Sequence, residues 1–301
     1  MTAGEVIVVG SVNVDLVVRI DHLPQAGETV TGGTFRRAPG GKGGNAAAAA
    51  ARLGARTRFV GLVGGDDLGE EARGDLTDAG VDVGTLGTTE APTGVAAILV
   101  DHAGRNVIAV APGANAELTG GHVRDALATV EAERAVVVAS LEIPDGAVAA
   151  AAEISGARGW PFILNPAPAR PLPGGLLDRC AAVIANELEA EALGLPGATP
   201  ATVVITRGAD GAEVHRPGRP VLRQPGFVVE VADTTGAGDA FVAALAWSML
   251  EGMQPERGVR IACAAGALAC RAVGARAGLG ARAEVEALAE TGSSGQRTGA
   301  R

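Results

Sequence analysis

The stretch Val6-Ile7-Val8-Val9-Gly10-Ser11-Val12-Asn13-Val14-Asp15 starts with four consecutive aliphatic residues and ends with polar residues at alternate positions. A short, unbroken aliphatic run predicts a strand in a parallel sheet that is covered on both faces. The run Ala135-Val136-Val137-Val138 has the same character. Because parallel sheets bind ligands beyond the carboxyl ends of their strands, Asn13 and Asp15 are candidates to bind a hydroxylated ligand, although an ordinary polar turn is the alternative.

Outward from this stretch, short apolar strands alternate with alanine-rich helical segments. The predicted strands are Val6–Val9, Arg58–Val63, Val136–Ala139, Phe162–Leu164, Ala182–Ala185 and Val203–Thr206. The predicted helices are Asn45–Leu53, Leu68–Ala79, Gly121–Ala132, Asp145–Ile154, Ala240–Glu251 and Pro255–Val273. This alternation predicts an α/β fold with a mostly parallel central sheet and helices on both of its faces.

Two pairs of strand-like segments interrupt the alternation, because no helix lies between their members. The pairs are Leu16–Ile20 with Thr29–Thr34, and Val95–Val100 with Asn106–Val110, the latter joined by a turn at Asp101-His102-Ala103-Gly104. We expect these four segments to form a small antiparallel sheet that stands off the main domain and acts as a lid.

The composition excludes several classes of function. Aromatic residues make up 2% of the 301 residues and tyrosine is absent, which leaves no phenolic acid or base and few rings to stack on single-stranded nucleic acid. The net charge of -9 opposes binding to a nucleic-acid backbone or an anionic membrane. The three cysteines lack metal-like spacing and the first residues lack a signal-peptide pattern, so we expect a soluble cytoplasmic protein.

A glycine-rich loop, Pro39-Gly40-Gly41-Lys42-Gly43-Gly44-Asn45, leads into a predicted helix. It is not a Walker A loop, because Gly43 follows the lysine, and it is not a dinucleotide fingerprint, because no predicted strand runs into it. We expect its backbone N–H groups to approach a polar ligand. Lys42 is the sole lysine beside 24 arginines, which favours a compact ammonium that donates to hydroxyl groups, although a flexible loop that kept one lysine by chance is the alternative.

A second glycine turn, Asp233-Thr234-Thr235-Gly236-Ala237-Gly238-Asp239, precedes a long apolar helix. Such a turn presents several N–H groups to an anion, and the helix dipole adds to the effect. Asp239 could be an ordinary helix cap, or it could be the base that removes a proton from an alcohol as the alcohol attacks phosphorus. Phosphoryl transfer requires an anion site and a base of this kind close together.

Asn186 and Glu189 follow the predicted strand Ala182–Ala185 and stand three residues apart on a helical turn. An amide and a carboxylate there could hold Mg2+ through water. An acidic first helical turn without a metal is the alternative.

Together and in this order, these segments resemble the ribokinase branch of the PfkB carbohydrate kinase family, from Val6 to about Val273. The segments 10–15, 40–45 and 233–239 match the family's amino-terminal sugar motif and its two signature regions. Three further segments resemble the ribokinase branch in particular: Pro92-Thr93-Gly94, Pro112-Gly113-Ala114-Asn115 and Leu164-Asn165-Pro166-Ala167-Pro168-Ala169.

The resemblance implies a three-layer α/β/α sandwich with a small β-sheet lid that also forms the contact of a homodimer. The sandwich would comprise residues 1–11, 39–91 and 112–290, and the lid residues 12–38 and 92–111. Residues 291–301, rich in Gly, Ser and Thr, are predicted to be a disordered tail.

The resemblance also implies ATP-dependent phosphorylation of the 5-hydroxyl of D-ribose. Asp239 would be the general base, and Gly236, Ala237 and Gly238 would form the anion hole. The implied ribose-binding residues are Asn13, Asp15, Gly41, Lys42, Gly43, Gly44, Asn45, Glu142 and Asp239. The implied ATP-binding residues are Asn186, Thr206, Arg207, Gly208, Ala209, Asp210, Gly211, Gly238 and Cys263. Mg2+ would be held by Asn186 and Glu189, and an activating K+ by Asp233, Thr235, Ala269, Ala272, Gly274 and Gly278.

Three features depart from the family pattern. The segment from Glu189 to Thr202 is too short for a full crossover helix, Gly278 replaces a common serine beside the cation, and Cys263 replaces a polar residue near adenine. A kinase for 2-deoxyribose, another furanose or a nucleoside stays open as an alternative, although the polar set around Lys42 favours a free sugar. The intact base and anion-hole glycines oppose a non-catalytic sugar or nucleotide sensor.

Overall fold

The computed structural model describes residues 4–197 and 199–291. Its central sheet has nine strands in the order β13-β12-β11-β10-β9-β8-β1-β4-β5. The strands are β1 (Glu5–Val9), β4 (Arg56–Gly64), β5 (Asp82–Thr89), β8 (Ala135–Ser140), β9 (Phe162–Asn165), β10 (Ala182–Asn186), β11 (Thr202–Thr206), β12 (Ala212–His215) and β13 (Leu222–Gln224). All pairings from β5 to β11 are parallel and only those of β12 and β13 are antiparallel, so the prediction of a mostly parallel sheet is confirmed.

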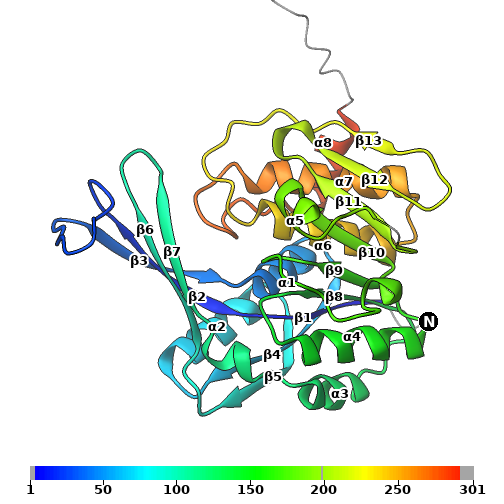
Figure 1. Cartoon of the computed structure of the whole chain (residues 1–301), viewed down its shortest axis with the longest axis horizontal. Coiled ribbons are helices and arrows are strands. Elements are labelled where there is room, and N and C mark those ends of the chain that lie inside the picture. Colours follow the sequence, from blue (N-terminus) through cyan, green and yellow to red (C-terminus); the bar gives the residue numbers. More distant parts are fainter. Residues whose placement is uncertain (1–3, 198, 292–301) are drawn as a thin grey trace, which may run out of the picture.

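Helices cover both faces of this sheet, as Figure 1 shows. The face to which Val6 and Val8 point packs against α1 (Lys42–Arg52), α2 (Asp67–Asp78), α6 (Ala237–Leu250), α7 (Pro255–Ala269) and α8 (Arg282–Glu290). The face of Ile7 and Val9 packs against α3 (Gly120–Ala128) and α4 (Asp145–Arg158). The α/β/α sandwich is therefore confirmed. No helix in the part of the chain that the structure describes is long and apolar enough to cross a membrane.

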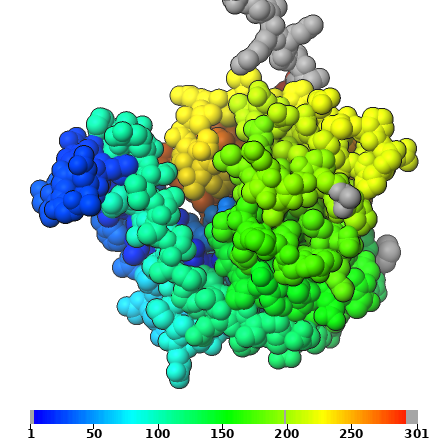
Figure 2. All heavy atoms as spheres, in the orientation of Figure 1, coloured from blue at the N-terminus to red at the C-terminus, as the bar shows by residue number. Residues whose placement is uncertain are grey.

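A second sheet, built from the part of the chain for which a lid is predicted, stands out from the side of the sandwich (Figures 1 and 2). Its strands, in the order β3-β2-β6-β7, are β2 (Asn13–Arg19), β3 (Thr34–Gly40), β6 (Gly94–Val100) and β7 (Asn106–Ala111). The outer pairings are antiparallel, but β2 and β6 run parallel. The wholly antiparallel lid that we predicted is thus wrong in its central pair, because both strands leave the main domain in the same direction.

The second strand of this sheet, β3, is also misplaced in the prediction, which put it at Thr29–Thr34. The strand begins at Thr34, where the predicted one ended, and it runs into the glycine loop at Gly40. Strand β3 is an exposed edge strand, so it has no run of apolar residues and contains Arg36, Arg37 and Pro39 instead. A search for apolar runs therefore does not detect it. The statement that no strand enters the glycine loop is therefore wrong.

Other differences concern short or exposed elements. Strands β5, β12 and β13 and helix α8 were not predicted, and helices α3 and α7 end earlier than expected, at Ala128 and Ala269. Among the described residues between β10 and β11, the chain forms only the short helix α5 (Glu187–Ala192), so the prediction that this part lacks a full crossover helix is confirmed. Three short 3-10 turns complete the described elements: Gly113–Glu117, Leu177–Arg179 and Gly208–Asp210. The predicted tail lies outside the described residues apart from Thr291.

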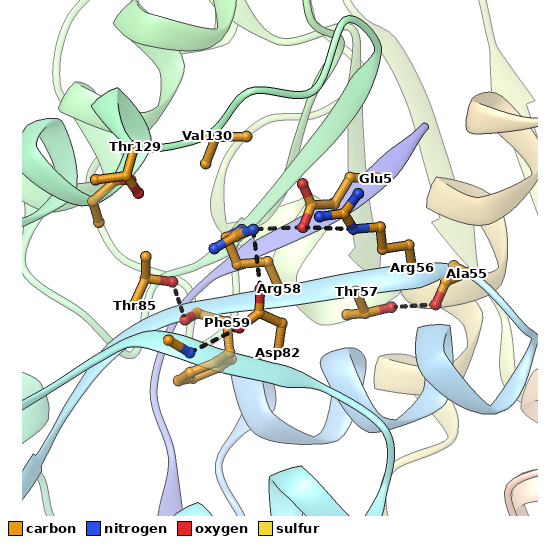
Figure 3. Close-up of polar contacts among 12 residues, drawn as sticks. Glu5, Ala55, Arg56, Thr57, Arg58, Phe59, Asp82, Thr85, Thr129 and Val130 are labelled. Carbon is orange, nitrogen blue, oxygen red and sulfur yellow. Dashed lines mark hydrogen bonds and ion pairs between the residues drawn. The ribbon is translucent and has the colours of Figure 1, made fainter. Parts of the chain in front are cut away.

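An ion-pair network fastens the amino-terminal ends of three neighbouring strands (Figure 3). Glu5 of β1 is only 1% exposed, and its carboxylate lies 3.0 Å from Nε of Arg58 on β4. Arg58 in turn lies 3.0 Å from the carboxylate of Asp82 on β5. Because the strands run parallel, this network lies at the edge of the sheet opposite to the carboxyl ends.

Candidate active site

The carboxyl ends of β1 and β8 meet the glycine loop. Ser11, just after β1, donates a hydrogen bond of 2.5 Å from Oγ to Oε2 of Glu142, which follows β8. The backbone N–H of Lys42 donates to the same carboxylate oxygen at 2.9 Å. Glu142 therefore joins two candidate sugar-binding segments that are far apart in the sequence.

The glycines of this loop pack closely against the chain between β1 and β2. Gly41 has φ +81°, and a Cβ there would lie 2.8 Å from Cα of Val12. A Cβ on Gly43 would lie 2.8 Å from Cα of Gly10. The absence of side chains thus lets the amino-terminal end of α1 approach the end of β1, which brings Lys42 toward the other candidate residues.

Asp239 lies in the first turn of α6 and is 7% exposed. It is not the helix cap, since Gly236 is the N-cap residue and no side chain caps that end. Nδ2 of Asn45, on α1, donates to Oδ2 of Asp239 at 2.9 Å. Burial raises the pKa of Asp239 to about 6, against the opposing effects of Lys42 and Asn45. A carboxylate of this kind is ionised at neutral pH yet able to accept a proton.

The turn before Asp239 has the backbone that an anion site requires. Gly236 has φ +79°, and a Cβ there would lie 2.4 Å from the carbonyl oxygen of Ala275. A Cβ on Gly238, in contrast, would have no other atom within 4 Å. The start of α6, with its N–H groups and positive dipole end, is therefore accessible on the side of Gly238.

Asn13 and Asp15 lie on β2, at the base of the lid. Asn13 accepts a hydrogen bond of 2.8 Å on Oδ1 from Nδ2 of Asn115, whose own Oδ1 accepts from the N–H of Val12 at 3.0 Å. Burial raises the pKa of Asp15 to about 6, although Arg276 lowers it. The sequence analysis assigned no role to Asn115. It could have done so, because Asn115 belongs to the segment Pro112-Gly113-Ala114-Asn115, which resembles the ribokinase branch.

A small cavity of about 10 Å³ lies between the first turns of α1 and α6 and the carboxyl ends of β8 and β9. Its polar lining comprises Lys42, Ser140, Asn165 and Asp239. Asn165, to which the sequence analysis assigned no role of its own, lies at the end of β9. The candidate base and the sole lysine thus border one space at the carboxyl edge of the sheet.

The candidate nucleotide residues lie at the neighbouring strand ends. Asn186 and Thr206 are opposite partners at the ends of β10 and β11. The turn from Arg207 to Gly211 closes with a backbone hydrogen bond of 2.8 Å between these two residues. Cys263 is 7% exposed and belongs to the hydrophobic core, and burial raises the pKa of its thiol to about 12.

Asn186 and Glu189 form a capping box at the start of α5. The N–H of Glu189 donates to Oδ1 of Asn186 at 2.8 Å, and the N–H of Asn186 donates to Oε2 of Glu189 at 2.9 Å. Among the described residues there is no group of three or more His, Cys, Asp or Glu side chains arranged to hold a metal. A Mg2+ at this place would therefore take most of its ligands from water and phosphate, as Mg2+ commonly does.

The candidate cation residues lie on two loops that pack together. Oδ1 of Asp233 accepts from N and Oγ1 of Thr235 at 2.9 and 2.7 Å, and Oδ2 accepts from the N–H of Gly274 at 2.9 Å. A Cβ on Gly278 would lie 2.3 Å from the carbonyl oxygen of Ala269. Although burial raises the pKa of Asp233, these hydrogen bonds hold it below its ordinary value. The ionised carboxylate of Asp233 and the carbonyl oxygen of Ala269 are oxygen groups of the kind that bind a monovalent cation.

Arg276, between these cation-loop residues, is the residue that the sequence did not suggest at all. Its Nε donates to Oδ1 of Asn45 at 3.0 Å, and its Nη2 donates to the carbonyl oxygen of Gly40 at 3.2 Å. No local pattern could reveal it, because Asn45 and Arg276 are 231 positions apart.

Comparisons with known proteins identify relatives of this chain. The family model described as pfkB family carbohydrate kinase matches residues 3–282. A ribokinase from Bacillus subtilis is 40% identical over 290 residues, covering 93% of this chain and 98% of that protein. The structure of a ribokinase from Arabidopsis thaliana complexed with ribose and ATP superposes with a TM-score of 0.86 at 31% identity, covering 97% of this chain and 100% of the other. A nucleoside kinase from Burkholderia thailandensis, in complex with inosine, shares the fold with a TM-score of 0.79 at 24% identity, over 95% of this chain and 96% of the other.

Proposed function

The chain belongs to the pfkB family of carbohydrate kinases, and we propose that it is a ribokinase, which transfers the γ-phosphoryl group of ATP to the 5-hydroxyl of D-ribose. The observation that carries the assignment is the buried carboxylate of Asp239 at the start of α6, held by Asn45 of the glycine loop. A base, an anion site and a sugar-binding loop are thereby brought together, as phosphoryl transfer to an alcohol requires.

Asp239 is the general base of this reaction. Since its pKa is raised to about 6, it is ionised near pH 7.5 and accepts the proton of the 5-hydroxyl as the sugar oxygen attacks phosphorus. The N–H groups at the start of α6, from Gly236 to Gly238, stabilise the negative charge of the migrating phosphoryl group. The proton then resides on Oδ of Asp239 until it passes to solvent.

The sugar is bound by groups that suit hydroxyls. Asn13, Asp15, Lys42, Asn45 and Glu142 supply amide, carboxylate and ammonium groups around the carboxyl end of β1. Glu142 is oriented by Ser11 and by the backbone of Lys42. Closure of the lid would exclude water, which otherwise competes with ribose for the phosphoryl group.

ATP would lie beyond β10 and β11, near Asn186, Thr206 and the turn from Arg207 to Gly211. Mg2+ would be held near Asn186 and Glu189 through water, and it would neutralise charge on the phosphates. K+ would bind the loops around Asp233 and Gly274 and order the anion hole rather than touch the sugar. The packing of Gly236 against Ala275 supports this coupling between the two loops.

The lid would form the contact of a homodimer. All six residues of its edge strand β7 are exposed, among them the apolar side chains of Val107, Ile108 and Val110. Phe35 on β3 is also exposed. An exposed apolar strand at a sheet edge is a surface that natural proteins usually cover, and a second copy of the lid would cover it. We also assign the protein to the cytoplasm, a proposal supported by its three free cysteines.

A sugar panel tests the proposed activity. ADP release is measured with purified protein, ATP, Mg2+ and K+, and with D-ribose, 2-deoxy-D-ribose, D-fructose or inosine as acceptor. We expect kcat/KM to be highest for D-ribose, because Asp15 and Glu142 offer acceptors to ring hydroxyls and the chain has few aromatic residues that could stack on a nucleobase. Higher kcat/KM for inosine would favour the nucleoside kinase alternative, and no turnover of ribose would refute the proposal.

A further inference from the structure

Arg276 connects the two ends of the glycine loop to the loop that follows α7. Its guanidinium donates from Nε to Oδ1 of Asn45 and from Nη2 to the carbonyl oxygen of Gly40. Asn45 then donates from Nδ2 to Asp239. The three side chains form one chain of hydrogen bonds that ends on the candidate base.

The direction of this chain follows from the chemistry of arginine. A guanidinium has only donors, whereas an amide has an acceptor on one side and donors on the other. Arg276 therefore requires Oδ1 of Asn45 to face it, and this leaves Nδ2 to face Asp239. A reversed amide would place N–H groups against the guanidinium and an oxygen against the carboxylate, and both contacts would be repulsive.

The charge of Arg276 acts in the same sense as its hydrogen bonds. The charged side chains that influence Asp239 are Lys42 on α1, Glu142 after β8, Arg276 after α7 and Asp15 on β2. Arg276 and Lys42 favour the ionised carboxylate, and Glu142 and Asp15 oppose it. Burial lowers the pKa of Arg276 to about 10, so this side chain is still charged at neutral pH.

We propose that Arg276 is a positioning residue for phosphoryl transfer, which fixes the Asn45 amide so that it holds the Asp239 carboxylate where the sugar hydroxyl loses its proton. The inference rests on the proposed function for the identity of the reaction. It concerns a residue outside the motifs that the family resemblance uses.

The first test compares Arg276→Met with Arg276→Lys in steady-state kinetics with ribose. Arg276→Met removes both donors and the charge, and we expect kcat to fall roughly tenfold to a hundredfold, the scale of one lost hydrogen bond to a charged network. The acid limb of its pH profile should move to higher pH. Arg276→Lys keeps the charge but loses the planar fork, so its kcat should fall while the acid limb stays in place. If a thermal unfolding scan shows that Arg276→Met does not fold, the kcat of Arg276→Lys serves as the test. A kcat of Arg276→Lys equal to that of the wild type would overturn the proposal.

Arg52 offers a matched control. It lies at the exposed end of α1 and lines the same surface cavity of about 340 Å³ as Arg276. Arg52→Met should leave both kcat and the acid limb unchanged. An equal effect of Arg52→Met and Arg276→Met would mean that the general loss of positive charge is responsible, and it would overturn the positioning role.

A double-mutant cycle tests whether Arg276 acts through Asn45. In the Asn45→Ala background, Arg276→Met should lower kcat by less than about threefold further, because the amide that it orients is gone. If the fold-decreases in kcat of the two single variants multiply in the double variant, the two residues act independently and the proposal is overturned.

A carboxyl NMR titration of the sugar-free protein separates this inference from the proposed function, because it requires no turnover. The Asp239 signal, identified by its absence in Asp239→Asn, should titrate at higher pH in Arg276→Met than in the wild type. If ribose is not a substrate but the midpoint moves, the proposed function fails and the link between Arg276 and Asp239 stands. If ribose is turned over and the midpoint does not move, the inference fails alone.

Discussion

Replacement of Asp239 by asparagine should make the folded protein more stable at neutral pH. Burial raises the pKa of this carboxyl from 3.8 to about 6. A group whose pKa rises on folding binds more protons in the folded than in the unfolded state between these two values. Its contribution to stability is therefore fully present below pH 3.8 and is lost as the pH rises through about 6.

The magnitude follows from the size of the pKa change. A difference of about two pKa units corresponds to about 3 kcal/mol, because each unit is worth ~1.36 kcal/mol. Asparagine removes the ionisation but keeps a carbonyl oxygen that can accept the hydrogen bond from Asn45. Asp239→Asn should thus raise the free energy of unfolding by up to about 3 kcal/mol at pH 7.5 and by little at pH 4.

Urea unfolding of the wild type and of Asp239→Asn, at several pH values from 4 to 8, measures this difference. Asp125→Asn, on the exposed surface of α3, is the control and should show no gain that grows with pH. If Asp239→Asn is no more stable than the wild type at pH 7.5, or if its advantage does not change with pH, the burial of an ionised base in this site is refuted.

Three further predictions concern other parts of the molecule. Arg58→Met removes the nearer partner of the buried carboxylate of Glu5 and leaves only Arg56, whose Nε lies 3.9 Å away, so it should lower the free energy of unfolding by about 2 kcal/mol, measured in urea, with kcat unchanged; an unaltered stability would contradict it. Gly40→Ala would place a Cβ 2.0 Å from Oδ1 of Asp15, so we expect KM for ribose to rise at least about tenfold, and a KM within twofold of the wild type would refute this contact. Ile108→Glu on the exposed strand β7 should convert a dimer into a monomer in light scattering, and a monomeric wild type would disprove the lid contact.

The local patterns predicted much of the sandwich and of the site. Unbroken aliphatic runs such as Val6–Val9 are typical of strands buried on both faces, and the structure has such strands at the centre of the sheet. The glycine clusters marked the amino-terminal ends of α1 and α6, because backbone can approach other groups closely only where side chains are absent.

The missed elements lacked such patterns. Strand β3 has arginines and a proline because it is an exposed edge, and β13 has only three residues. The parallel pairing of β2 with β6 depends on how two distant segments leave the main domain, which no local pattern records. Arg276 reaches Asn45 across 231 positions, so only the folded chain brings it to the site.

The most direct test of the account is the turnover of D-ribose by the wild type and by Asp239→Asn, with ATP, Mg2+ and K+, combined with ribose binding measured by calorimetry. The account predicts ribose 5-phosphate as the product of the wild type, a kcat about 10²–10⁴-fold lower in the variant, and ribose affinities within about threefold of each other. A variant that keeps kcat within tenfold of the wild type would contradict the role of Asp239 as the base.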